Sequence, residues 1–200
     1  MELLKERILK DGVVVSSSIL KVDSFLNHQI DGKLMYEIGR EFKKRFENEG
    51  ITKILTIEAS GIAVAVMAAL HFDVPMVFAK KKKPSTLQGE VLKARVFSFT
   101  KETYYDICMS KDFLCKDDKV LIVDDFLANG HASLALVDLV EEAGAEVAGI
   151  GIVVEKGFQG GRNSILSQGI RLESLAIIES LEENKINIKY DFKSNYSSRI

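Results

Sequence analysis

Cysteine, proline and net charge are all scarce in this sequence. Its 200 residues include two cysteines and two prolines, and the formal net charge is −2. Cys108 and Cys115 lack the spacing of a metal site, and two lone thiols are typical of a protein in a reducing cytoplasm. No apolar run approaches the ~20 residues that span a bilayer, and residues 1–7 are charged rather than signal-like. A charge so close to zero gives no reason to expect nucleic acid or a membrane as a partner.

The composition is that of an ordinary globular domain, with 46% hydrophobic and 28% charged residues. A chain of this length can bury a sizeable core, and we find no internal repeat and no linker in it. We predict a single domain over residues 1–192 and a polar tail over residues 193–200. The histidines are scattered without the spacing of metal ligands, so we expect no metal site formed by the protein alone.

Strand-like and helix-like segments alternate along the chain. Apolar runs predict core strands at residues 51–59, 75–80, 119–126 and 145–156. Periodicity predicts helices over residues 33–48 and 60–70, and a third with Leu136, Leu139, Val140 and Ala143 on one face. Residues 94–100 and 103–109 predict a two-stranded ribbon. This alternation predicts an α/β fold, in which helices cover a central parallel sheet.

Polar residues follow each predicted core strand. In sheets of this kind ligands bind beyond the carboxyl ends of the strands. Those ends are residues 58–61, 80–83, 124–132 and 155–158. Their convergence at one edge of the sheet predicts the site.

The most specific stretch is KVLIVDDFLANGHAS, residues 119–133, in which an apolar strand runs into Asp124 and Asp125. A phosphoreceiver domain begins similarly, but only 75 residues follow Asp125, and none of them forms the further strand ending in a phosphorylatable aspartate. A dehalogenase-type phosphatase needs its second acid two positions after the first, where Phe126 stands. A plain turn with solvated acids is the remaining alternative to a ribose-phosphate site, which explains the stretch best.

The chemistry of a ribose-phosphate site fits this stretch residue by residue. Small residues that open a helix let backbone N–H groups converge on a phosphate: Ala128, Asn129, Gly130, His131 and Ala132. Ser133 can add a hydroxyl donor. Asp124 and Asp125 can accept hydrogen bonds from the 2- and 3-hydroxyls of the sugar.

The same stretch resembles the phosphoribosyl-diphosphate (PRPP) signature of type I phosphoribosyltransferases. Asn129 and Ala132 replace the threonines common in that signature, so phosphate binding would depend more on backbone N–H groups. The form DDFLANG resembles that of the bacterial xanthine-using members. The resemblance extends to residues 20–31, 51–63, 97–101 and 149–162. It implies the type I phosphoribosyltransferase fold, with a small hood from about residues 1–32, 84–109 and 157–192.

The resemblance also implies a reaction. A purine nitrogen attacks C1 of PRPP, pyrophosphate leaves, and with xanthine the product is xanthosine 5'-monophosphate. The resemblance implies that Asp124 and Asp125 are the catalytic residues and that Mg²⁺ is held mainly by PRPP oxygens. It also implies a homodimer in the cytoplasm. Alternatives are a transferase for guanine or hypoxanthine, and a PRPP-sensing regulator of purine genes. Such regulators carry an added DNA-binding module, and we find no pattern for one here.

Two further loops are assigned to PRPP. Ala59 and Ser60 resemble the pyrophosphate loop of the family, although a simple serine-capped helix would also explain them. Lys81 lies in a basic run that is either a solvated turn or a ligand for pyrophosphate.

The purine site is assigned by resemblance to Leu20, Asn27 and Lys156. The ammonium of Lys156 only donates, so it should prefer a 6-oxo group to the 6-amino group of adenine. Phe158 either stacks on the purine ring or belongs to the core.

Overall fold

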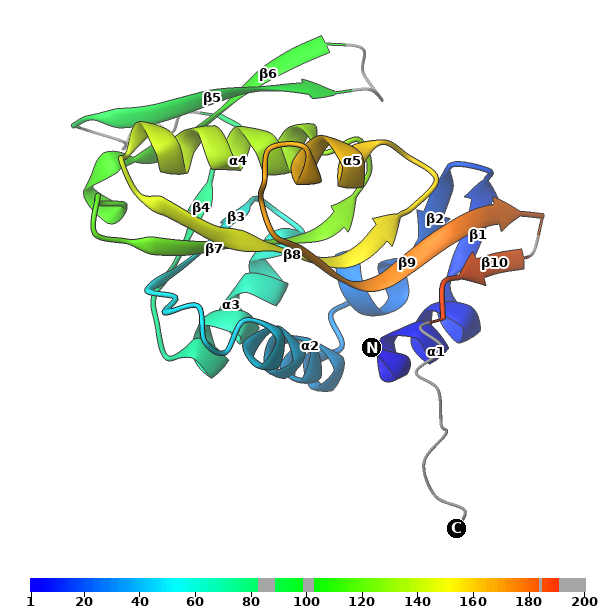
Figure 1. Ribbon diagram of the computed structural model, residues 1–200. Helices are drawn as coiled ribbons and strands as arrows, with labels where there is room; N and C mark the ends of the chain where they lie inside the picture. Colours follow the sequence, from blue (N-terminus) through cyan, green and yellow to red (C-terminus); the bar gives the residue numbers. More distant parts are fainter. Residues whose placement is uncertain (83–88, 99–102, 184, 191–200) are drawn as a thin grey trace.

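A parallel sheet forms the centre of the molecule. The computed structural model describes residues 1–82, 89–98, 103–183 and 185–190. Within these residues, six strands form the main sheet in the order β10-β9-β8-β7-β3-β4 (Figure 1). Its parallel strands are β3 (Lys53–Ile57), β4 (Met76–Ala79), β7 (Lys119–Leu127), β8 (Glu146–Lys156) and β9 (Leu172–Glu182). The last strand, β10 (Lys185–Ile188), is antiparallel to β9.

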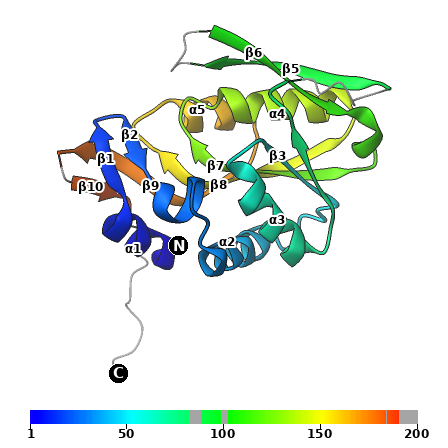
Figure 2. The same ribbon diagram turned by 180° about the vertical axis from the view of Figure 1, so that it is seen from behind.

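Helices cover both faces of this sheet. α2 (Gly32–Arg45) and α3 (Gly61–Phe72) lie on one face, and α4 (His131–Glu142) and α5 (Gly161–Leu166) lie on the other (Figures 1 and 2). Alternate residues of a strand point to opposite faces, so Leu121 packs with the first pair of helices and Ile122 with α4. The predicted α/β fold is confirmed.

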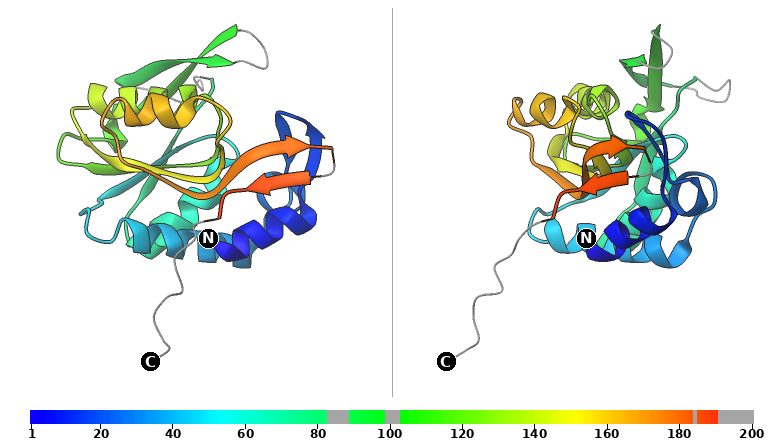
Figure 3. Two further views of the ribbon diagram at one scale, coloured as in Figure 1. Left: turned by 45° about the vertical axis from the view of Figure 1, so that its right-hand side comes forward. Right: turned by 90° about the vertical axis from the view of Figure 1, so that its right-hand side faces the viewer.

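The amino-terminal segment packs beside the far edge of the sheet. It consists of α1 (Glu2–Asp11), a hairpin of β1 (Val13–Ser16) and β2 (Ile19–Lys21), and a π-helical turn, η1 (Asp23–Asn27). Figure 3 shows this hairpin next to β9 and β10. The predicted hood segment 157–192 includes β9, which pairs with β8 and is a strand of the central sheet.

A separate ribbon of β5 (Val91–Ser98) and β6 (Thr103–Ser110) lies over α4 (Figure 1). It is followed by a short 3₁₀ turn, η2 (Lys111–Phe113). The backbones of Lys80 and Cys108 exchange two hydrogen bonds, of 2.8 and 2.9 Å, which join the ribbon to the end of β4. Parts of the predicted hood, residues 84–88 and 99–102, and the predicted tail lie outside the described residues.

Element boundaries differ from the predictions by a few residues. The predicted helix 33–48 ends at Arg45, and the predicted strand 51–59 is shorter at both ends. β7 runs through the acid pair, as the predicted strand 119–126 does, and ends one residue later, because Phe126 and Leu127 still pair with Val154 and Glu155 of β8. None of the described helices is long and apolar enough to cross a membrane.

Candidate active site

The acid pair lies inside β7 and is buried. Asp124 is 5% exposed and Asp125 is 7% exposed, and the N–H of Asp125 donates to Oδ1 of Asp124 at 2.9 Å. Burial, together with the charge of Asp125, raises the pKa of Asp124 well above the usual range of an aspartate, while Lys81 acts in the opposite direction. Two carboxylates held in a dry site suit neutral hydrogen-bond donors such as sugar hydroxyls.

The small-residue loop leads directly from this pair into α4. Gly130 has φ of 88° and is the residue before the helix, whose first turn has no side-chain cap among the described residues. The amides of a first helical turn lack intrahelical acceptors, so Ala132 and Ser133 direct theirs out of the helix end. A cavity of about 210 Å³ lies there, lined by the loop residues 126–133. This arrangement is suited to a phosphate group.

The amino end of α5 supports the loop from behind. The N–H of Gly161 donates to the carbonyl of Ala128 at 3.0 Å. A Cβ atom at Gly161 would lie 2.4 Å from that carbonyl oxygen and 2.9 Å from the nitrogen of Gly130, which is too close for any side chain. Sequence reasoning missed Gly161, because its role depends on a contact between segments 30 residues apart.

The loop after β3 also reaches the acid pair. A Cβ atom at Gly61 would lie 2.9 Å from Oδ1 of Asp124 and 2.1 Å from Oγ1 of Thr56, so glycine lets α3 begin close to the carboxylates. Ala59 is exposed and Ser60 is partly exposed just before this helix. Ser60 is the N-cap residue, but its side chain makes no cap hydrogen bond. The amino end of α3 therefore lies beside the acid pair.

Lys81 follows β4 at the same edge of the sheet. Its N–H donates to Oε1 of Glu58 at 2.7 Å, which ties the ends of β3 and β4 together. Its side chain is exposed, and its charge favours the ionised form of Asp124. Three of the predicted strand ends thus meet around the acid pair.

The fourth strand end carries Lys156. Nζ of Lys156 donates to the carbonyl of Ser18 at 2.8 Å and lies 5.7 Å from the centre of the Phe126 ring. Burial lowers the pKa of this lysine. The contact brings the turn of the β1–β2 hairpin to the end of β8.

The other residues predicted for the purine site lie in different surroundings. Leu20 is buried and belongs to the core cluster on the α2–α3 face, while Asn27 is exposed at the end of η1. Phe158 is 39% exposed, so it is not a core residue in this structure. Their contacts with a purine stay predictions.

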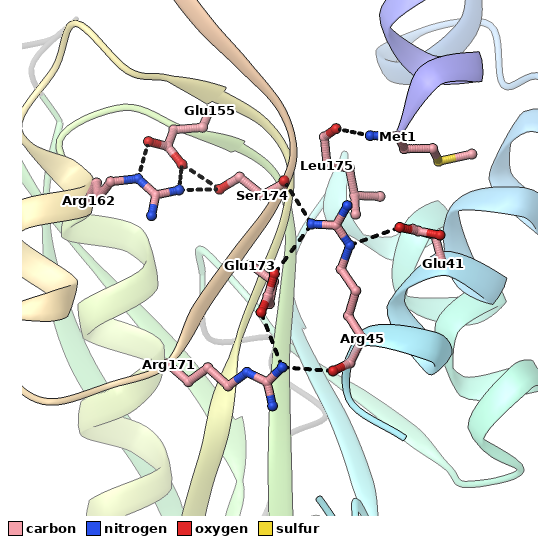
Figure 4. A network of polar contacts seen from close by, with 9 residues as sticks. All are labelled: Met1, Glu41, Arg45, Glu155, Arg162, Arg171, Glu173, Ser174 and Leu175. Atoms are coloured by element: carbon pink, nitrogen blue, oxygen red, sulfur yellow. Dashed lines mark hydrogen bonds and ion pairs between the residues drawn. The ribbon is translucent and has the colours of Figure 1, made fainter. Parts of the chain in front are cut away.

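Glu155, next to Lys156, has a structural role. It is 1% exposed and accepts hydrogen bonds from Nε and Nη2 of Arg162 at 2.7 and 2.5 Å, and from the Ser174 hydroxyl at 2.5 Å. The hydrogen bonds to Glu155 raise the pKa of Arg162. Figure 4 shows this cluster on one side of β9, with Arg45 bound to the Ser174 carbonyl on the other. The ion pair between Glu155 of β8 and Arg162 of α5 holds α5, and with it Gly161, against the sheet.

Comparison with known proteins identifies the class of protein that this fold and site define. The family model for the phosphoribosyl transferase domain matches residues 27–167, which include the acid pair, the loop and Lys156. The chain belongs to this family.

Curated relatives are similar over nearly the whole chain. It is 58% identical over 189 residues to the xanthine phosphoribosyltransferase of Clostridium novyi (strain NT), covering 94% of this chain and 100% of that protein. It is 56% identical over 189 residues to the xanthine phosphoribosyltransferase of Oceanobacillus iheyensis, covering 94% of this chain and 97% of that protein. The corresponding protein of Staphylococcus aureus (strain Newman) is 57% identical over 188 residues, covering 94% of this chain and 98% of that protein.

Solved structures of more distant relatives have the same fold. The adenine phosphoribosyltransferase of Thermoanaerobacter pseudethanolicus superposes with a TM-score of 0.65 at 28% identity, covering 74% of this chain and 81% of that one. The adenine phosphoribosyltransferase of Rhodothermus marinus superposes with a TM-score of 0.71 at 24% identity, covering 89% of this chain and 100% of that one.

Proposed function

We propose that this protein transfers the 5-phosphoribosyl group of PRPP to xanthine, giving xanthosine 5'-monophosphate and pyrophosphate in purine salvage. One observation carries the proposal: a buried acid pair leads, through a loop of small residues, to the amino end of α4, which opens on a cavity of about 210 Å³. The names of the relatives that are 56–58% identical to the chain support xanthine as the base.

PRPP binding follows from the order of the groups along the sheet edge. The amides of residues 128–133 and the Ser133 hydroxyl hold the 5-phosphate. Asp124 and Asp125 accept from the 2- and 3-hydroxyls, and these hydrogen bonds fix the sugar. The pyrophosphate then lies toward Ala59, Ser60 and Lys81, where the α3 end and a cation offset its charge.

Positioning and electrostatics account for most of the catalysis in this proposal. The transition state of such a transfer has oxocarbenium character, so positive charge develops at the sugar as pyrophosphate leaves. The buried carboxylates of Asp124 and Asp125 lie beside that charge, where a low dielectric strengthens their attraction. In this proposal the protein forms no covalent bond to either substrate.

The surroundings of Lys156 support xanthine as the purine. Lys156 already donates to a carbonyl oxygen, that of Ser18, and a 6-oxo group of xanthine is an acceptor of the same kind. The 6-amino group of adenine would leave a half-buried ammonium facing another donor. Asn27 both donates and accepts, which suits the 2-oxo edge of xanthine.

Mg²⁺ fits this site as a companion of PRPP. The described residues contain no group of three or more His, Cys, Asp or Glu side chains that could hold a metal, so diphosphate oxygens would supply most ligands. Bound there, the ion would help to neutralise the charge of the leaving pyrophosphate. We further propose that the enzyme acts as a homodimer in the cytoplasm.

The test is to incubate the protein, Mg²⁺ and PRPP with one purine base at a time and to identify the nucleotide formed. We expect xanthosine monophosphate, with much less product from hypoxanthine or adenine. Equal turnover of guanine or hypoxanthine would contradict the specificity for xanthine and leave the transferase intact. Absence of any nucleotide, with tight binding of PRPP and of DNA, would instead indicate a regulator.

The acid pair provides the internal control. The double variant Asp124→Asn/Asp125→Asn should lose PRPP affinity by at least tenfold, since each hydrogen bond to a charged group contributes about 1.5–3 kcal/mol. Asp138→Asn, at an exposed position of α4, should behave as the parent protein. An unchanged KM for PRPP in the double variant would refute the ribose assignment.

A further inference from the structure

The cavity at the phosphate loop has a second wall, which comes from the ribbon. Val96 and Phe97 of β5 and Tyr105 of β6 line it together with residues 126–133. The ring centres of Phe97 and His131 are 6.0 Å apart, so the ribbon touches the first turn of α4. A ligand held by the loop would therefore also lie against the ribbon.

Of the described ribbon residues that line the cavity, Tyr105 is the one with a hydroxyl group. It is partly buried, and burial followed by the charge of Asp124 raises the pKa of its phenol. The phenol therefore stays protonated and can donate at any physiological pH.

The loop itself offers few hydroxyl groups to a phosphate. Of residues 128–133, only Ser133 has a hydroxyl. A phosphate dianion has three terminal oxygens, each of which accepts more than one hydrogen bond. A donor from the opposite wall would complete the shell that the backbone amides begin.

We propose that Tyr105 is a binding residue for the phosphoribosyl group, and that its hydroxyl donates to the 5-phosphate across the cavity from Gly130 and Ala132. The ribbon thereby closes the phosphate end of the site, and the loop and ribbon hold the ligand between them. The inference rests on the proposed function for the identity of the phosphate as that of PRPP.

The neighbouring tyrosine provides a matched control. Tyr104 is 64% exposed, and it packs against Phe97 and Arg95 at 5.0 and 5.8 Å. It is not among the described residues that line the cavity. Tyr104→Phe and Tyr105→Phe therefore each remove one phenolic hydroxyl, from adjacent positions of one strand. Only Tyr105→Phe affects the cavity wall.

The experiment measures the binding of ribose 5-phosphate by calorimetry and the KM values for PRPP and xanthine in both variants. We expect Tyr105→Phe to weaken ribose 5-phosphate about tenfold, as for one hydrogen bond to a charged group, and to raise the KM for PRPP similarly. The KM for xanthine should not change, and Tyr104→Phe should match the parent protein in every measurement.

Two results would overturn the inference: unchanged ribose 5-phosphate affinity in Tyr105→Phe, or an equal loss in both tyrosine variants. Binding of ribose 5-phosphate needs no purine, so the two proposals fail separately. If the protein makes no xanthosine monophosphate but Tyr105→Phe still loses ribose 5-phosphate, the proposed function fails and the inference stands. If the enzyme makes that nucleotide and Tyr105→Phe binds normally, the inference alone fails.

Discussion

Single residues of the ribose-phosphate loop were predictable because the whole loop is one continuous stretch of sequence. Asp124, Asp125 and residues 128–133 follow each other directly, so the pattern of strand, acids and small residues is visible without the fold. Tyr105 and Gly161 were not predictable in this way. Gly161 contacts the loop, and Tyr105 lines the cavity beside it, only because separate elements pack there, and neither residue has a local motif that indicates this placement.

Lys81 and Lys82 form a second matched pair of neighbours. Both side chains are exposed, but the N–H of Lys81 is bound to Glu58 and the charge of Lys81 acts on Asp124, whereas Lys82 follows one residue further on. Lys81→Ala should raise the KM for PRPP about tenfold, because a cation beside the pyrophosphate is lost. Lys82→Ala should change it less than about twofold, as for a solvated charge. Steady-state kinetics with varied PRPP measures both values, and equal effects would show that the basic run acts only through its overall charge.

At the scale of elements, apolar runs predicted the strands that lie fully inside the sheet. β7 and β8 are almost entirely buried, and such strands read as continuous hydrophobic sequence. β9 was missed because its burial is irregular and its sequence, LESLAIIESLE, mixes acidic residues with apolar ones. The predicted strand 119–126 already included the two acids, and β7 ends one residue later, at Leu127.

Support of the loop by α5 leads to a prediction at this scale. Gly161→Ala places a Cβ atom 2.4 Å from the Ala128 carbonyl, so the loop must move away from α5. We expect the affinity for ribose 5-phosphate to fall by about tenfold or more, because misplacement of the amides weakens several hydrogen bonds at once. Gly160→Ala is the control, since a Cβ atom there has no neighbour within 4 Å and the backbone is helical. Calorimetry measures both variants, and normal binding by Gly161→Ala would show that the loop does not depend on this contact.

The pair of Glu155 and Arg162 leads to a second prediction for the same element. Arg162→Met leaves the carboxylate of Glu155 buried without its cation, and loss of one partner of a buried pair costs about 3–5 kcal/mol. Urea unfolding should show a loss near the lower end of this range, because Arg162 itself is one-third exposed. The double variant Glu155→Gln/Arg162→Met should recover part of that stability, since no buried charge remains. If the double variant is no more stable than Arg162→Met, the loss comes from packing rather than from charge.

At the scale of the whole molecule, the two faces of the sheet and its carboxyl edge contribute to stability in opposite ways. The sheet and its helices bury apolar side chains on both faces, which stabilises the fold. The carboxyl edge instead holds Asp124 and Asp125 against each other in a dry environment, which opposes folding. This division was predictable in outline, since four polar strand ends were visible in the sequence. The burial of the acids was not, because it depends on elements distant in the sequence, such as α3, whose first residue lies against Asp124.

The buried acid pair therefore predicts that the parent protein is less stable at neutral pH than a variant in which the charge of Asp124 is removed. The pKa of Asp124 is raised in the folded state, so the folded protein binds more protons than the unfolded chain between the two pKa values, and stability falls as pH rises through that window. Asp124→Asn removes the charge, and its amide oxygen can still accept from the N–H of Asp125. The variant should have a higher Tm than the parent at pH 7, by a few degrees for each 1 kcal/mol regained. The difference should shrink on acidification and vanish below about pH 4, where an ordinary aspartate is also protonated in the unfolded chain.

Thermal unfolding from pH 4 to 8 measures this difference in Tm, with Asp138→Asn as the exposed control. A variant less stable than the parent at pH 7 would mean that attraction to Lys81 outweighs burial and the repulsion from Asp125.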